Sequence, residues 1–129
     1  MKFSTFHLFQ TPPGVPDDQI ILQEVELMKY VEDLGFDAVW VGEHHFRGEG
    51  VAASVPVLLS AVAGATKRIR VGPAVSCLPL TDPLRNAEDY ATLDVISGGR
   101  LNFGVGLGNR AGESLVWGIP FTEMRERFN

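Results

Sequence analysis

The chain has 129 residues, of which 45% are hydrophobic and 21% charged, so it contains enough apolar material for one folded core. Its formal net charge of −5 argues against a nucleic-acid surface, and no apolar run is long enough to cross a membrane. The single cysteine, Cys77, excludes a disulfide within the chain. With no sign of a signal peptide at the start, we expect a cytoplasmic protein.

The first part of the chain reads as strand, helix and strand. Residues 2–9 are aromatic and extended, and the proline-rich segment 10–16 must be a loop. A helix is expected from a cap at Asp17 or Asp18 to about Leu34, with Gly35 closing it as the residue after the C-cap. Residues 36–41 are mostly apolar and predict a buried strand, followed by a loop over residues 47–53.

Residues 55–65 form an expected helix that carries no charge. Ser54 is its predicted N-cap, and Pro56 is tolerated in the first turn. An outer helix of an α/β fold normally shows a polar face to water. The missing charge therefore indicates a subunit interface, or else coverage by another part of the same chain.

The rest of the chain repeats this alternation. A strand is expected over residues 69–75 and a loop over 76–81, before the helix start at Asp82-Pro83. That helix should run to about Ile96, and it is followed by a strand over residues 101–105 and by helices starting near Ala111 and Thr122. Its apolar stripe is expected to face inward, and the stripe consists of Leu84, Ala87, Ala91 and Val95.

Alternating strands and helices indicate a parallel sheet with right-handed crossovers. An open flavodoxin-like sheet needs about five strands, and this chain supplies about four. Closed (β/α)8 barrels run to about 250 residues. We therefore predict an α/β fold of the TIM-barrel type in which one domain, residues 1–129, holds about the first four βα units.

Three titratable residues, Glu43, His44 and His45, follow the strand over residues 36–41. Ligands of parallel α/β folds bind at this carboxyl edge of the sheet, so the residues are candidates for handling protons or holding a metal. A metal site is disfavoured because adjacent strand residues point to opposite faces. His7, in the first strand, is expected to be a buried structural residue.

Several separated segments resemble the bacterial luciferase-like flavin monooxygenases, a (β/α)8 superfamily that also contains deazaflavin-dependent reductases. The resemblance covers essentially the whole chain. Its most specific parts are Glu43-His44-His45-Phe46, Leu78-Pro79 with Asp82-Pro83, and Ser97-Gly98-Gly99-Arg100-Leu101.

The resemblance implies an enzyme that uses reduced FMN and O2 on a small organic substrate, with FMN a cosubstrate or a bound cofactor. A separate flavin reductase is a possible partner. It also implies a homodimer or heterodimer formed through the helices at residues 55–65 and 83–96. Two alternatives stay open: a deazaflavin-dependent oxidoreductase, and a non-catalytic flavin-binding or dimer-partner subunit.

The resemblance also assigns roles to single residues. His44 would be the catalytic histidine beside the flavin, with Glu43 supporting it, whereas His45 would face the subunit interface with Glu88 as its partner. The Ala74–Val75 bond lies where the family often has a cis peptide under the flavin ring. The remaining cofactor-binding residues would be Gly106, Leu107 and Asn109, although many members carry arginine at the position of Leu107.

Four further side chains are given structural roles. Cys77 is expected to be a packed, inert thiol, and Trp40 and Trp117 to be core residues. Arg100 is expected to anchor a helix terminus to a carboxylate such as Asp94.

Overall fold

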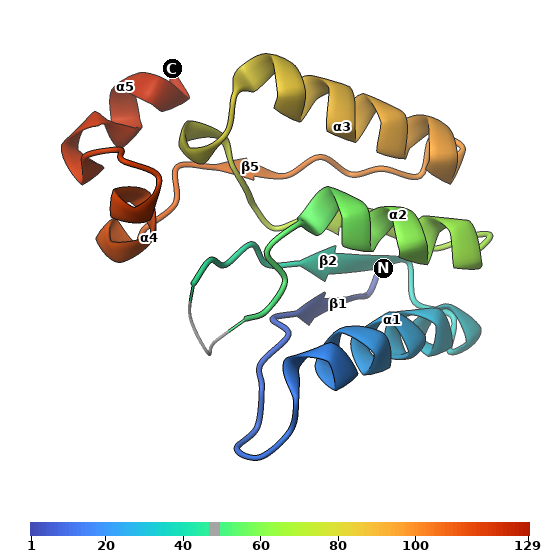
Figure 1. Ribbon diagram of the computed structural model, residues 1–129. Coiled ribbons are helices and arrows are strands. Elements are labelled where there is room, and N and C mark those ends of the chain that lie inside the picture. Colours follow the sequence, from blue (N-terminus) through green and yellow to red (C-terminus); the bar gives the residue numbers. More distant parts are fainter. Residues whose placement is uncertain (47–49) are drawn as a thin grey trace.

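The computed structural model describes residues 1–46 and 50–129, and it shows strands and helices alternating along the chain (Figure 1). Among these residues, no helix is both long enough and apolar enough to cross a membrane. The elements in chain order are β1 (Ser4–His7), α1 (Asp17–Asp33), β2 (Ala38–Val41), α2 (Val55–Ala65), β3 (Arg70–Pro73), β4 (Ser76–Cys77), the 3-10 turn η1 (Leu78–Leu80), α3 (Pro83–Ser97), β5 (Val105–Gly106), α4 (Ala111–Val116), the 3-10 turn η2 (Phe121–Glu123) and α5 (Met124–Phe128).

The strands form the expected parallel arrangement. β1, β2 and β3 pair in that order, with Phe6 opposite Trp40 and Trp40 opposite Gly72. β4 and β5 form a second parallel pair. An isolated bridge between Val71 and Leu101 joins the segment before β5 to β3, so the two sheets are continuous through the backbone.

Two predicted strands are divided in the structure. The strand expected over residues 69–75 stops at Pro73, and the ladder resumes at Ser76 inside the segment that was expected to be a loop. In the last strand, Leu101 makes only a bridge and the regular ladder covers Val105–Gly106. The chain is nevertheless paired there, because Ser76 N donates to Gly104 O at 2.9 Å.

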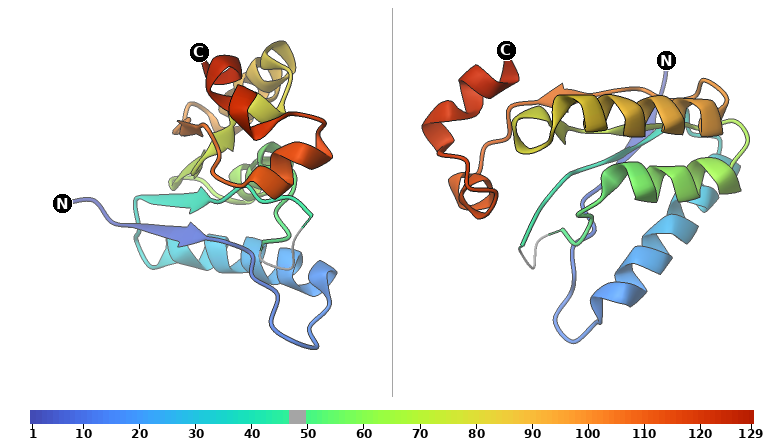
Figure 2. Two further views of the ribbon diagram at one scale, coloured as in Figure 1. Left: turned by 90° about the vertical axis from the view of Figure 1, so that its left-hand side faces the viewer. Right: turned by 45° about the horizontal axis from the view of Figure 1, so that its top comes forward.

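The three long helices lie on one side of the strands (Figure 2). Side chains alternate between the two faces of a strand, so Val39 and Val71 are fully buried under the helices. Phe6 points the other way and is 55% exposed. In a closed barrel that second face would form the interior, which fits the α/β class that the sequence predicts.

The helix ends agree with the sequence in part. Asp82 caps α3 by accepting hydrogen bonds from Leu84 N and Arg85 N, both at 3.0 Å. Gly35 and Gly98 follow α1 and α3 with φ of +86° and +68°, a conformation that favours glycine. Neither Asp17 nor Asp18 caps α1, because Asp17 is already helical and the N-cap is Pro16.

Ser54 occupies the N-cap position of α2 but makes no capping hydrogen bond through its side chain. Of the loop expected over residues 47–53, residues 47–49 lie outside the described part of the chain.

The orientation predicted for α3 was wrong. All four residues of its apolar stripe are exposed, with Leu84 at 71% and Val95 at 81%. The buried side of α3 includes polar residues, which a hydrophobic pattern cannot identify as core. It consists of Asn86, Tyr90, Leu93 and Ser97.

Arg100 joins the ends of α2 and α3 to β3. Its guanidinium donates to Ala63 O and Ile69 O, each at 2.7 Å, and to Ser97 O at 2.6 Å. It also bonds to Thr66 through the hydroxyl and the carbonyl oxygen. The expected helix anchor is therefore present, but the guanidinium donates to carbonyl and hydroxyl oxygens, and the Asp94 carboxylate accepts from Leu101 N instead.

We predict that Arg100→Met lowers the free energy of unfolding by about 2–4 kcal/mol, because it leaves several partly buried carbonyl groups without donors. Arg85→Met is the matched control: Arg85 is exposed and pairs with the exposed Glu88, so its loss should cost less than about 0.5 kcal/mol. Urea unfolding of both variants measures the difference between their free energies of unfolding. Equal stability of the two variants would contradict this role of Arg100.

Candidate active site

The carboxyl ends of β2, β4 and β5 surround a cavity of about 300 Å³. We call it the active-site cavity. Protein ligand pockets span about 300–1,000 Å³, so it has the size of a small one. The residues that line it are Gly42, Glu43, His44, Ala74, Val75, Cys77, Leu107, Gly108 and Asn109.

The structure thus gathers most of the predicted cofactor residues around one space. Ala74, Val75, Leu107 and Asn109 all line the active-site cavity, whereas Gly106 does not. The Ala74–Val75 peptide bond is cis, as the resemblance implies. Gly106 lies beneath this segment, because a Cβ built on it would be 2.3 Å from Val75 Cγ2.

The shape of this lining fits a flat ring system. Glycine and alanine expose backbone there, which lets an aromatic ring approach closely. Among the described residues that line the cavity, none is lysine or arginine, so the lining offers no cationic partner for a phosphate. The residues present therefore fit the ring of a flavin or deazaflavin but not its phosphate.

His44 lies at one side of this cavity, close to a carboxylate that sequence analysis missed. Its Nδ1 is 3.5 Å from Glu113 Oε1, and the Glu113 side chain is only 7% exposed. The contact is close enough for an ion pair but falls outside hydrogen-bond geometry, and Glu113 Oε1 has no hydrogen-bond partner among the described residues. This contact leaves Nε2 as the ring nitrogen on the side away from the Glu113 carboxylate.

Glu43 and His45 form a buried pair of their own. His45 Nε2 donates to Glu43 Oε1 at 2.9 Å, and Glu43 Oε2 accepts a hydrogen bond from Cys77 N at 3.1 Å. Residues two apart in extended chain point to the same side, whereas the intervening His44 points to the other. Glu43 therefore contacts His45 and not His44, in contrast to our expectation.

Within the chain His45 pairs with Glu43, and its expected pairing with Glu88 at a subunit interface stays a prediction. His45 is 7% exposed and therefore buried within the chain. The Glu88 carboxylate is on the surface of α3, 3.3 Å from Arg85 Nη1.

Cys77 has the character of a packed thiol. It is 5% exposed, and burial, with smaller contributions from the charges of Glu43 and Glu113, raises its pKa to about 12. Trp40 is half-buried in the sheet, but the core position expected for Trp117 was wrong, since it is 46% exposed. The edge of its ring meets His45 with centroids 5.4 Å apart.

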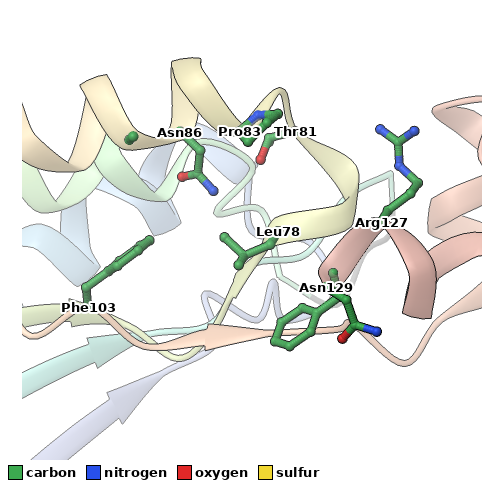
Figure 3. Close-up of a pocket in the computed structure, with 9 residues that line it drawn as sticks. Leu78, Thr81, Pro83, Asn86, Phe103, Arg127 and Asn129 are labelled. Atoms are coloured by element: carbon green, nitrogen blue, oxygen red, sulfur yellow. The ribbon is translucent and has the colours of Figure 1, made fainter.

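A larger cavity, of about 560 Å³, lies between α3, η1 and α5 (Figure 3). Phe103 and Leu78 extend into it, and Arg127 lies at its side, with Nε donating to Pro79 O at 2.9 Å. None of the predicted catalytic or cofactor residues lines it. Within residues 1–46 and 50–129, no group of three acidic, histidine or cysteine side chains could hold a metal ion.

Sequence comparison decides the family. The model of the luciferase-like monooxygenase family matches residues 1–129. The chain belongs to this family. It is 36% identical over 129 residues to the alkanal monooxygenase alpha chain of the Kryptophanaron alfredi symbiont, covering all of this chain and 36% of that one. The luciferase-like chain described here thus spans little more than a third of that relative.

Solved structures share the fold. The oxygenating constituent of 3,6-diketocamphane monooxygenase from Pseudomonas putida, in complex with FMN, superposes with a TM-score of 0.90 at 24% identity, over 99% of this chain and 37% of that one. The coenzyme F420-dependent tetrahydromethanopterin reductase of Methanopyrus kandleri superposes with a TM-score of 0.71 at 29% identity. The match covers 93% of this chain and 30% of that one. Solved structures that share this fold therefore include one in complex with FMN and one that depends on coenzyme F420.

We predict that the Cys77 thiol reacts with iodoacetamide about 1,000-fold more slowly in the folded protein than in urea at pH 8. The raised pKa of about 12, compared with the ordinary 9.0, lowers the thiolate fraction by this factor. The folded rate should keep rising with pH up to about 12, whereas the rate in urea should level off near 9. Mass spectrometry measures both rates on the only cysteine, and equal rates would contradict a buried thiol.

Proposed function

We propose that this chain forms the catalytic part of a flavin-dependent monooxygenase that uses reduced FMN and O2 to oxygenate a small organic substrate. The observation that carries the proposal is the contact of His44 with Glu113 beside a cavity lined by Ala74 and Val75. This joins a proton-handling pair to a surface that suits a flat ring.

The residues have separate tasks in this proposal. Ala74, Val75 and Gly108 would hold one face of the ring through backbone and short side chains. When bound, reduced flavin supplies the electrons that activate O2. His44 takes or donates a proton at Nε2, and Glu113 stabilises the charge that the imidazole then carries. Leu107 closes the apolar side of the cavity, where it excludes water.

The second candidate is a deazaflavin-dependent oxidoreductase, favoured by the 29% identity to the coenzyme F420-dependent reductase. Titrating the whole protein with reduced FMN and with reduced F420 separates the two, since the luciferase-like proposal predicts tight binding of FMN and O2 uptake. Binding of F420 alone, with no O2 uptake, would favour the second candidate.

We predict that His44→Ala lowers turnover by about 100- to 10,000-fold, the range typical of general acid–base groups. Glu113→Gln should lower it by about 10- to 100-fold, because a lost charged contact costs about 1.5–3 kcal/mol. Glu26→Gln, on the exposed side of α1, serves as the control for Glu113→Gln. Steady-state O2 uptake measures the turnover of all three variants. Unchanged turnover in His44→Ala would contradict the catalytic role of His44.

We further propose that the protein dimerises through α2 and α3 with a second luciferase-like subunit. α2 contains no charged residue, and its Val57 is 67% exposed. The apolar stripe of α3, which the sequence places in the core, lies on the surface with Leu84 and Val95 exposed. α2 and α3 run side by side (Figure 1), and Val57 of α2 lines a groove together with Asp89 and Thr92 of α3. Glu88 lies on the same side of α3 by its spacing from Leu84 and Val95.

We predict that the pair of substitutions Val57→Glu and Val95→Glu converts the dimer to a monomer, because it buries like charges at the interface. Leu22→Glu is the control, since Leu22 is 68% exposed on α1. Light scattering during size-exclusion chromatography measures the mass. A double variant that keeps the wild-type dimer mass would exclude this surface as the interface.

A further inference from the structure

Two apolar side chains lie beside the active-site cavity on the side of β1. Gly42, which lines the cavity, follows β2 on the inner face of the sheet, the face of Trp40. A Cβ built on Gly42 would be 3.0 Å from Leu8 Cδ2 and 3.2 Å from Phe6 Cζ. Carbon atoms in contact are normally about 3.5–4.0 Å apart, so these two side chains lie directly on the main chain of Gly42. We call Phe6 and Leu8 the apolar wall.

The apolar wall is next to His44. Gly42 and His44 are two residues apart, so they point to the same side where the chain continues in extended form. Gly50 lies between His44 and Leu8, because a Cβ built on it would be 3.0 Å from His44 Cδ2 and 2.9 Å from Leu8 O. Its φ of +95° is a conformation that favours glycine. His44 and Leu8 are therefore neighbours across the main chain of Gly50.

The apolar wall offers a ligand surface but no hydrogen-bond partner. Leu8 is partly exposed and Phe6 is more than half exposed, so both have surface left for contact. Each methylene group that a ligand buries there should raise its affinity about fourfold. A hydroxyl or charged group in the same place would give up its hydrogen bonds with water and lose about 5- to 150-fold in affinity.

We propose that the apolar wall binds the hydrocarbon part of the substrate, an alkyl chain or an alicyclic ring, and holds it beside His44. Gly42 is then a positioning residue, because its missing side chain lets Leu8 and Phe6 lie against the main chain. The role of this ligand as the substrate rests on the proposed function. The binding of a hydrocarbon group rests only on residues of this chain.

The test compares two probes, octan-1-ol and octane-1,8-diol, which differ by one hydroxyl group at the far end of the chain. Isothermal titration calorimetry of the whole protein without flavin measures their dissociation constants. We expect octan-1-ol to bind at least about fivefold more tightly, because the second hydroxyl of the diol finds no partner at the apolar wall.

Leu8→Asn places a hydrogen-bonding group in the wall and should bring the two dissociation constants to within about twofold of each other. Leu22→Asn, at an exposed leucine of α1, is the matched control and should keep the wild-type ratio. Gly42→Ala displaces Leu8 and Phe6, so it should weaken octan-1-ol binding at least about fourfold, the effect of one methylene group. Gly64→Ala should leave it unchanged, because a Cβ there meets nothing within 4 Å.

A wild-type ratio that persists in Leu8→Asn would overturn the proposal, as would equal octan-1-ol binding by Gly42→Ala and Gly64→Ala. If Gly42→Ala does not fold, the ratio in Leu8→Asn decides by itself, since Leu8 is partly exposed. The measurement needs neither flavin nor turnover, so its failure leaves the proposed function standing. Absence of O2 uptake with reduced FMN would instead remove the proposed function and leave the binding of a hydrocarbon group intact.

Discussion

The alternation of side chains at the end of β2 governs the chemistry of this molecule. Three consecutive residues leave a buried parallel strand, and the geometry of extended chain sends the middle one, His44, to a different side from Glu43 and His45. His44 lines the active-site cavity and contacts Glu113, whereas His45 is buried against Glu43. One short segment thus supplies a partly exposed imidazole and a buried hydrogen-bonded pair.

The second constraint is the close approach of neighbouring chain segments in β3, β4 and β5. Gly72 leaves no room for a side chain, because a Cβ there would be 2.3 Å from Asn102 O. Gly106 is equally restricted by Val75. These contacts bring β3, β4 and β5 together so that the floor of the cavity is formed mainly by main chain and small groups. A flat cofactor needs such a surface more than it needs particular side chains.

Sequence reasoning succeeded where local rules decide the outcome. Asp82 caps its helix and Gly98 closes it because these residue types satisfy helix ends locally, although the same capping rule did not hold at Asp17 and Ser54. It failed where tertiary contacts decide. The outward stripe of α3 and the inward Asn86 depend on what packs against the helix, which periodicity alone does not contain. Glu113 lies 69 positions after His44 in the chain, so only the folded structure shows that the two side chains are neighbours.

The central claim is that the cavity at Ala74–Val75 holds the ring of the cofactor. A crystal structure of the whole protein with FMN tests it most directly. The isoalloxazine ring should contact Ala74 and Val75, with its edge toward His44. A flavin bound instead between α3 and α5, or on the α2–α3 surface, would contradict it.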